Sequence, residues 1–516
     1  MSVKVVSIPV LFLGAMIGQA FAQQPSKEVL KVVENHKGIV ENVAQTLWDK
    51  SEISLHEKES TAFLQDILVK NGFQITEKGS AGVPTAFIAE FGSGEPKLGI
   101  MLEYDALPGL GNKAVPRKEA RDDGITAGHG CGHNLIGAGA MGAALALKDL
   151  MTANKTTGTL RVYGGAAEET EGAKVYMARA GKFDDLDAML HWHPSPQTVV
   201  ANVVSTAQQQ IYIEFSGKTA HAGNAPWLGR SALDAAELFL NGVNYMREHV
   251  KPTARIHYVI RNGGEAPNIV PDKASVQLIF RDAKRDDVEA GVAWIEDIAK
   301  GAALMTQTKS FVVPYYGMYS LLPNTPLAER MHGYLESVGV PEFTAEELKF
   351  TKDLQTAAGV EATGLANAVT PLPDGQTVGG STDVGDISWI VPTMGLSVSS
   401  MPLGIGLHTW PATASHGTSI GKKAAFTAAE VLALTGWDVL NDADFRKNMK
   451  ADFDKRTEGF VYKSPLPDLI KEPVGLPDVD RKYGSVLELK EAIFNQMGDH
   501  QLAPHGVHDQ DHPHSH

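Results

Sequence analysis

The sequence of 516 residues predicts an α/β fold, in which a wound α/β domain is interrupted by a smaller α+β domain. Segments with strand and helix periodicity alternate from residue 86 to residue 192. A strand-helix-strand-strand-helix pattern follows between residues 210 and 304, and α/β character returns beyond residue 314. The chain is also longer than one compact core supports, so we expect two domains.

The first domain begins with helices and then alternates strands with helices. Periodic apolar residues predict helices over 26–51 and 60–72, and the Ala- and Gly-rich segment 136–150 predicts a helix packed closely on a sheet. The nearly continuous apolar segment 97–103 predicts a strand that is buried on both faces. The remaining elements keep the alternation, with strands at 86–90, 159–163 and 188–192 and a helix at 172–180.

The interrupting segment follows a different plan. Its periodicity predicts strands at 210–215, 255–261 and 275–281 and helices at 231–249 and 286–304. The strand at 210–215 alternates as if one of its faces were exposed. This order of elements is typical of a ferredoxin-like sandwich, with helices on one face of an antiparallel sheet.

We therefore divide the chain into five segments. They are a leader at 1–22, the first part of the α/β domain at 23–205, the inserted domain at 206–314, the second part of the α/β domain at 315–445 and a C-terminal extension at 446–516. The extension is polar, contains several prolines and ends in a histidine-rich tail, so we expect it to be partly disordered. Its histidines are possible metal ligands.

The N-terminus has the pattern of a secretory signal peptide. Lys4 provides a positive charge, residues 5–17 are apolar, and Ala20-Phe21-Ala22 forms a small-x-small cleavage site. The apolar run is short for a membrane span, and we expect no later segment to be apolar and long enough. We expect a soluble, secreted protein of the periplasm. The formal net charge of −15, without a run of Lys or Arg, argues against nucleic acid and membrane as partners.

Cys131 is the only cysteine and lies within the run Gly128-His129-Gly130-Cys131-Gly132-His133-Asn134. A lone cysteine usually behaves as a small buried apolar residue. In an oxidising compartment an exposed free thiol is a liability, whereas a metal ligand is protected. Thiolate and imidazole groups on a glycine-rich turn are suitable ligands for a borderline divalent metal ion, with carboxylates from elsewhere completing the shell.

Other candidate ligands lie at the ends of predicted strands. Glu168-Glu169 follows an apolar strand, where adjacent carboxylates repel each other unless a cation lies between them or one is protonated. One carboxylate can hold a metal ion while its neighbour takes a proton from water and passes it to a leaving amine. The other candidates are His191, His193, His408, His416, Glu103 and Asp105. Spacing alone does not separate His191 from His193. The residues predict a hydrolytic metal site with one or two ions.

These motifs together resemble those of the M20 family of metallopeptidases and amidohydrolases. The resemblance rests on Glu168-Glu169 and on the runs 101–108, 128–134, 192–194 and 380–386, and it covers residues 32–434. Within the amidohydrolase branch the chain is most similar to the p-aminobenzoyl-glutamate hydrolase type. The resemblance implies a wound α/β catalytic domain with an inserted α+β, ferredoxin-like lid and dimerisation domain.

The resemblance also implies roles for particular residues of the catalytic domain. The implied metal ligands are Cys131, His133, Glu169, His193 and His408, with Cys131 bridging two ions. Glu168 matches the general base and acid, and Asp105 matches an aspartate that orients a ligand. Glu103 stands where other branches have a ligand histidine, and we do not count it as a ligand. His408 is preferred to His416 because it lies in the family's His-Thr-Trp motif, and His129 is expected to be a supporting residue.

In the lid domain the resemblance implies three further residues. His221 matches a histidine that reaches across a dimer and stabilises the developing oxyanion. Asn268 and Arg281 match positions that hold the free carboxylate of the substrate, and a guanidinium group pairs well with a carboxylate. The alternatives are a hydrogen bond within the lid sheet for Asn268 and a surface ion pair for Arg281.

The expected function is that of an exported metal-dependent amidohydrolase or peptidase acting on a linear amide bond, with an N-acyl amino acid such as p-aminobenzoyl-glutamate as substrate. Two divalent ions per chain are implied, with zinc preferred and manganese or cobalt as alternatives. The expected partners are a small amide or dipeptide with a free carboxylate and a second copy of the chain in a homodimer. An M20-type dipeptidase or carboxypeptidase remains an alternative, as does a metal-binding periplasmic protein without catalysis.

Overall fold

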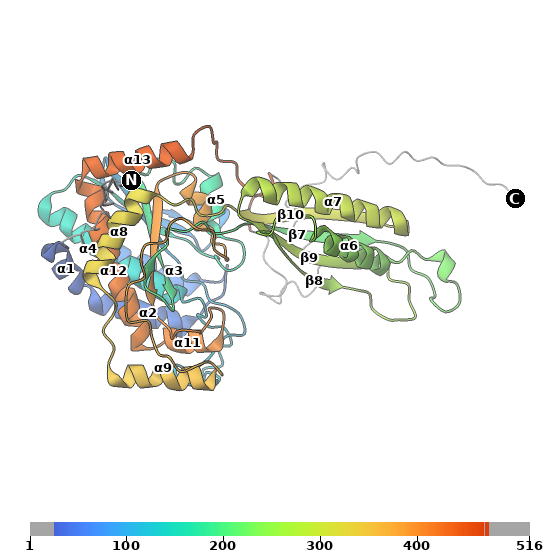
Figure 1. Ribbon diagram of the computed structural model, residues 1–516, viewed down its shortest axis with the longest axis horizontal. Helices are drawn as coiled ribbons and strands as arrows, with labels where there is room; N and C mark the ends of the chain where they lie inside the picture. Colours follow the sequence, from blue (N-terminus) through green and yellow to red (C-terminus); the bar gives the residue numbers. More distant parts are fainter. Residues whose placement is uncertain (1–24, 469, 474–516) are drawn as a thin grey trace, which may run out of the picture.

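Figure 1 shows the computed structural model, in which an elongated inserted domain projects from one side of a larger domain. The structure describes residues 25–468 and 470–473. The predicted leader at 1–22 and the histidine-rich tail therefore lie outside the described residues. Each domain has its own sheet and its own hydrophobic core. The predicted fold class, a wound α/β domain with an inserted α+β domain, is confirmed.

The larger domain is built on a mixed sheet of seven strands in the order β1-β2-β4-β3-β5-β11-β6. The central strands are parallel, because β3 pairs with β4 and β5, and β5 pairs with β11. The last five residues of β3 are buried, as the apolar run predicted. The strands are β1 (Gln74–Lys78), β2 (Phe87–Ser93), β3 (Lys97–Leu102), β4 (Gly158–Gly164), β5 (Ala188–Ser195), β6 (Val199–Val200) and β11 (Thr393–Ser399).

Helices α4 (His133–Asn154) and α12 (Ser419–Asn441) lie against this sheet, and α1, α2 and α8 pack on them. Gly139 of α4 allows close packing, since a Cβ there would lie 2.7 Å from both the carbonyl oxygen of Ala425 and the indole nitrogen of Trp192. The other helices are α1 (Lys27–Glu34), α2 (Lys37–Lys50), α3 (Lys58–Lys70), η1 (Ser80–Gly82), α5 (Ala173–Arg179), α8 (Thr325–Val338), α9 (Ala345–Ala357), α10 (Val384–Ser388), α11 (Trp410–His416) and α13 (Ala443–Arg456).

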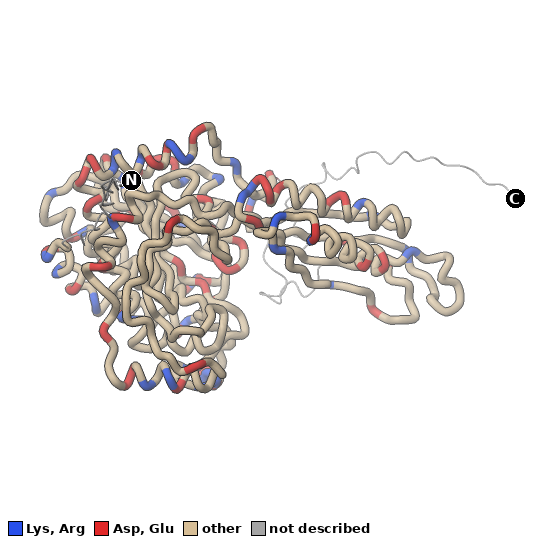
Figure 2. The backbone as a smooth tube through the Cα atoms, in the orientation of Figure 1, with Lys and Arg blue, Asp and Glu red and all other residues tan. Residues whose placement is uncertain are grey.

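Helix α4 is long and apolar enough to cross a membrane by composition, which differs from the expectation for segments after the leader. However, 83% of its most apolar window is buried inside the larger domain. We therefore describe α4 as a core helix. Figure 2 shows acidic and basic residues interspersed along the helices of both domains.

The inserted domain, hereafter the lid domain, spans residues 207–318 and has a four-stranded antiparallel sheet in the order β10-β7-β9-β8. Its elements are β7 (Ala207–Ser216), η2 (Pro226–Leu228), α6 (Ala232–Met246), β8 (Arg255–Asn262), β9 (Lys273–Asp282), α7 (Arg285–Thr306) and β10 (Lys309–Met318). The order of strands and helices is the ferredoxin-like plan. The domain boundary expected after residue 314 falls inside β10, because this strand stays paired with β7 as far as Met318.

Strand β7 differs from the half-exposed strand that its alternation predicted. Its first nine residues are buried because β7 lies inside the sheet, between β10 and β9. Ile211 and Ile213 enter the lid core beneath α6 and α7. Gln208 and Gln210 line the cavity described below. Both faces of β7 are therefore buried, one in the lid core and the other against the cavity.

The periodic segment 26–51 forms two helices rather than one. Helix α1 ends at Glu34 and α2 begins at Lys37, and His36 between them has non-helical backbone angles. The His36 ring lies 2.8 Å from the carboxylate of Asp149 on α4. This contact holds the junction of the two helices against the core helix.

The first part of the C-terminal extension, as far as the structure describes it, is ordered and packs on the larger domain. The boundary expected after residue 445 falls inside α13, and residues 457–468 and 470–473 then return across the larger domain as a strap. Leu466 and Ile470 of the strap are buried in the core. Tyr462 donates a hydrogen bond of 2.8 Å to Asp386, and Arg179 donates one of 2.5 Å to the carbonyl of Ile470.

Candidate metal centre

Polar side chains gather where three neighbouring parallel strands end. Glu103 and Asp105 follow β3, the Glu168-Glu169 pair follows β4, and His193 lies near the end of β5. The carboxyl ends of parallel strands meet at one edge of a sheet, which is where ligands of wound α/β folds bind. The loop that carries Cys131 ends at the first turn of α4, beside the same edge.

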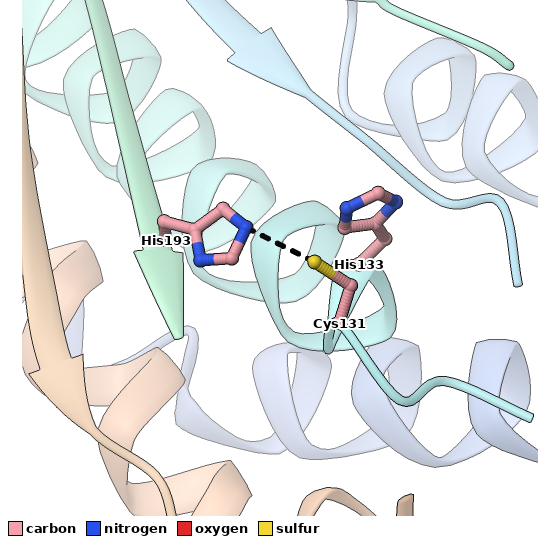
Figure 3. A group of neighbouring side chains, drawn as sticks. All are labelled: Cys131, His133 and His193. Atoms are coloured by element: carbon pink, nitrogen blue, oxygen red, sulfur yellow. Dashed lines mark hydrogen bonds between the residues drawn. The ribbon is translucent and has the colours of Figure 1, made fainter. Parts of the chain in front are cut away.

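The thiol of Cys131 lies beside the imidazole rings of His133 and His193 (Figure 3). The distance from Cys131 Sγ to His193 Nε2 is 3.4 Å. The Nδ1–H of His193 donates a hydrogen bond of 2.7 Å to the carbonyl of Pro194, which leaves Nε2 directed at the sulfur. Gly132 is required at the turn, because a Cβ there would lie 2.8 Å from Pro194 and its φ is +87°.

His133 is held by a buried aspartate. Its Nδ1–H donates a hydrogen bond of 2.8 Å to Asp105, which leaves Nε2 3.8 Å from a carboxylate oxygen of each of Glu168 and Glu169. Asp105 also accepts hydrogen bonds from the Ser54 hydroxyl at 2.8 Å and from the backbone N–H of Glu169 at 3.0 Å. Asp105 therefore fixes both the ring of His133 and the loop that carries the two glutamates.

His408 comes from a distant part of the chain. Its Nε2 lies 3.3 Å from a carboxylate oxygen of Glu169, and its backbone N–H donates a hydrogen bond of 3.1 Å to Gly130. Cys131, Glu169 and His408 offer ligand atoms within 4.8 Å of one another, as do Cys131 with His133 and His193, and His133 with Glu168 and Glu169. The structure thus brings together all five residues that were predicted as ligands, with Glu168 beside them.

The chemistry of this cluster fits a divalent metal pair. His133 Nε2 and Glu169 Oε1 are buried without a hydrogen-bond partner, although buried polar atoms are normally paired. Burial, with the charge of Glu169, raises the pKa of the Cys131 thiol well above its usual value, so a thiolate here requires a nearby cation. Thiolate, imidazole and carboxylate groups are a donor set that suits zinc.

The competing histidines lie outside the three groups of ligand atoms. His191 is buried and lines the cavity next to them. His416 donates a hydrogen bond of 2.8 Å from Nδ1 to the carbonyl of His129, and the His129 ring donates one of 2.9 Å to the carbonyl of Leu47. His129 and His416 therefore support the loop that carries Cys131.

Lys174 is a site residue that the sequence motifs did not reveal. Its ammonium group is fully buried and lies 3.0 Å from Glu103 and 2.6 Å from Asp383. Burial would lower the pKa of Lys174, but the charges of Asp383 and Glu103 outweigh it and raise the pKa. The available signal was a lysine inside the otherwise apolar stretch 173–178 of a predicted helix, which is unusual unless the lysine is paired.

The lid domain contributes to the cavity beside the cluster. Arg281 of β9 lines the same cavity as Glu168, Cys131 and His193, and its Nη1 donates a hydrogen bond of 2.9 Å to Ser381. His221 and Asn268 lie together elsewhere on the lid domain, where His221 pairs with Ile269, and neither lines this cavity. The structure thus places one of the three predicted lid residues at the site of its own chain.

The fold and the site together define a two-domain hydrolase, in which a thiol, imidazole and carboxylate cluster lies next to a lid domain. The chain belongs to peptidase family M20/M25/M40, whose family model matches residues 99–404. It is accordingly an enzyme that hydrolyses amide bonds. The family resemblance predicted from the motifs is confirmed.

The curated relatives agree with this assignment, and a solved structure agrees with the fold. The chain is 36% identical to one of the subunits of p-aminobenzoyl-glutamate hydrolase of Escherichia coli, over 83% of this chain and 94% of that protein. It is 29% identical to the Xaa-Arg dipeptidase of Mus musculus, over 72% of this chain and 78% of that protein. A solved putative aminohydrolase from methicillin-resistant Staphylococcus aureus has the same fold, with a TM-score of 0.60, 17% identity and coverage of 80% of this chain and 99% of that one.

Proposed function

We propose that this chain is an exported, metal-dependent amidohydrolase that cleaves the amide bond of an N-acyl amino acid similar to p-aminobenzoyl-glutamate. The observation that supports it is one cavity lined by four of the five candidate ligands, by the carboxylate of Glu168 and by the cation of Arg281. A substrate with an amide bond next to a free carboxylate matches these groups. The name of the Escherichia coli relative supports the same substrate class.

Cys131, His133, Glu169, His193 and His408 would hold two divalent ions in this proposal, with zinc preferred and manganese or cobalt as alternatives. Bound divalent ions polarise a carbonyl group and acidify water. The export part of the proposal is supported by the predicted leader at 1–22, which would direct the enzyme to the periplasm.

Glu168 is the proton carrier of the proposed reaction. It would take a proton from the attacking water and pass it to the nitrogen of the leaving amine. Burial, with the charges of Glu103, Glu169 and Asp383, raises the pKa of Glu168 well above its usual value. A carboxylate with a raised pKa is a stronger base, which suits this task near neutral pH.

The lid domain would bind the substrate and complete the site. Arg281 would pair with the free carboxylate. His221, with Asn268, would act on the site of a second copy of the chain in a homodimer, where His221 donates to the developing oxyanion. The dimer proposal is supported by the exposed apolar residues Tyr245, Val259 and Ile260 on the lid domain and by β8, which is an edge strand.

The first prediction concerns Glu168→Gln. We expect the chain from residue 23, loaded with zinc or manganese, to release glutamate from p-aminobenzoyl-glutamate, and the variant to lose at least about 100-fold in kcat because the proton carrier is removed. Metal analysis should find two ions per chain in both proteins. Equal turnover in the variant would contradict the role of Glu168, and bound metal without any turnover would contradict the proposed substrate.

A further inference from the structure

One face of the lid sheet carries two rows of side chains that line the cavity. Arg281, Gln208 and Met318 are directly opposite one another on β9, β7 and β10. Ile279, Gln210 and Tyr316 form the next row on the same strands. All six residues line the cavity that holds the metal cluster. Partners that are directly opposite or diagonal on one sheet face lie within reach of a common group.

Three of these side chains have buried polar atoms without a hydrogen-bond partner: Arg281 Nε, Gln208 Oε1 and Tyr316 Oη. Gln208 is 4% exposed and Tyr316 is 1% exposed, so solvent does not pair with these atoms. Gln210, by contrast, accepts a hydrogen bond of 2.6 Å from Tyr315. Buried polar groups of folded proteins are normally paired, so three unpaired groups on one cavity wall indicate a site for a polar ligand.

The position of Tyr316 relates this wall to the reacting groups. A Cβ on Gly172 would lie 2.3 Å from Tyr316 Oη and 2.7 Å from a carboxylate oxygen of Asp383. Gly172 closes the loop that carries Glu168 and Glu169. The absence of a side chain at Gly172 therefore allows the hydroxyl of Tyr316 to approach this loop.

The charges of the cavity limit what the wall can bind. Among the described residues that line it, Arg281 is the only Lys or Arg. The only Asp or Glu residues among them are Glu103, Glu168 and Glu169, which belong to the metal cluster and its surroundings. A guanidinium or ammonium side chain of a substrate would have no carboxylate outside the metal cluster and its surroundings to pair with. It would also lie near the positive charge of Arg281. The wall therefore disfavours a basic amino-acid moiety.

We propose that Gln208 and Tyr316 are substrate-binding residues that recognise the side chain of an acidic amino-acid moiety or its carboxamide, while Arg281 binds the α-carboxylate. The tyrosine hydroxyl can donate a hydrogen bond to a carboxylate or amide oxygen. The unpaired Oε1 of Gln208 accepts from the –NH2 of a carboxamide, and a half-turn of the Gln208 amide presents its own –NH2 to a carboxylate instead. An N-acyl glutamate satisfies all three groups at once, whereas an N-acyl norleucine leaves Gln208 and Tyr316 unpaired. The inference rests on the proposed function and names the side chain that the site selects.

The test compares p-aminobenzoyl-L-glutamate with p-aminobenzoyl-L-glutamine, p-aminobenzoyl-L-norleucine and p-aminobenzoyl-L-arginine. We expect Gln208→Leu and Tyr316→Phe each to raise KM for the glutamate compound about tenfold or more, with a smaller change in kcat. KM for the norleucine compound should stay unchanged. The glutamine compound shows whether the charge or only the hydrogen bonds are selected. The arginine compound should be the poorest substrate of the four.

A control variant and a binding measurement keep this test independent of the proposed function. Tyr258→Phe removes a lid hydroxyl that faces Asn244 and not the cavity. It should change neither the KM for the glutamate compound nor the KM for the norleucine compound. L-Glutamate and L-norleucine are also titrated calorimetrically into the metal-loaded proteins. If no acyl compound is hydrolysed, the proposed function fails while the titration still decides the inference. Equal affinity for the two amino acids, or affinity for L-glutamate that the two variants leave unchanged, would overturn it.

Discussion

Lys174 shows how a single residue can organise the centre without belonging to the ligand cluster. Its ammonium group neutralises Glu103 on one side and Asp383 on the other, and all three side chains are buried. Without this lysine, three carboxylates that lie near one another would repel each other in a region of low dielectric constant. They are those of Glu103, Glu168 and Asp383. A buried charge that loses its partner is costly, so this lysine is required by the carboxylates around it.

A prediction follows for Lys174→Met, which keeps the length of the side chain but removes the charge. We expect it to lower the free energy of unfolding by about 3–5 kcal/mol, because Glu103 and Asp383 lose their buried partner. Urea denaturation measures this change. Lys182→Met is the matched control, since Lys182 pairs with Glu77 where both side chains are partly exposed, and should cost less than about 1 kcal/mol. Equal losses in the two variants would contradict the role of Lys174.

At the residue scale, much of the candidate site could be predicted because its residue types are unusual in their context. Packing alone seldom requires a lone cysteine between two histidines, or a pair of glutamates after an apolar strand. Both patterns therefore indicate a chemical role. His191 and His193 could not be separated in this way, since both lie on the same side of β5 and only the fold shows which ring reaches Cys131. Gln208 and Tyr316 have ordinary residue types, so only their unpaired atoms in the cavity reveal them.

At the scale of elements, α12 shows how the packing of helices alters the pKa of a side chain. Glu430 lies on α12 and is partly buried where α12 packs against α1 and α2. Burial, followed by the charge of Glu34 on α1, raises the pKa of Glu430 to about 7, while Lys37 of α2 opposes the shift. The folded state therefore holds this proton more tightly than the unfolded chain does. Stability linked to Glu430 is fully present below the unfolded pKa of 4.5 and is lost as pH rises towards 7.

The prediction is that Glu430→Gln stabilises the protein at pH 8 and has little effect at pH 4.5. Glutamine cannot ionise, so the variant avoids a cost that we place at about 2 kcal/mol after allowance for partial exposure. Thermal unfolding at both pH values measures the difference. The exposed Glu329 of α8, replaced by glutamine, serves as the control for the loss of a glutamate charge at the surface. A gain for Glu430→Gln that is the same at both pH values would contradict the explanation.

The elements themselves could be predicted wherever periodicity was strong. Strands β8 and β9 and helices α6 and α7 of the lid domain, with the buried strand β3, follow directly from their apolar patterns, whereas β10 was not predicted. The break between α1 and α2 could not be predicted, because it depends on the contact of His36 with Asp149 on another helix. The burial of β7 and the docking of the C-terminal strap likewise depend on neighbours that are distant in the sequence.

At the scale of the whole molecule, the proposed dimer can be tested by mixing two inactive variants. Glu168→Gln removes the proton carrier of its own chain, and His221→Ala removes the group proposed to serve the site of the other copy. A mixed dimer would contain one site with both residues intact, so we expect the mixture to recover activity that neither variant has alone. Size-exclusion chromatography with light scattering measures the oligomer. A protein that is monomeric, or a mixture that remains inactive, would contradict the proposed role of His221.

The lid domain enters and leaves the larger domain through two adjacent strands, since Gln208 and Met318 are antiparallel partners at its base. Gln208, Arg281 and Tyr316 all lie inside this one continuous segment, whereas Glu168 and the five ligand residues all lie outside it. Recombination near Gln208 and near Met318, which are neighbours in space, would therefore exchange the lid residues that line the cavity. Glu168 and the candidate ligands would stay in place. Under the proposed roles of Gln208, Arg281 and Tyr316, a single transferred gene segment would carry a new substrate preference.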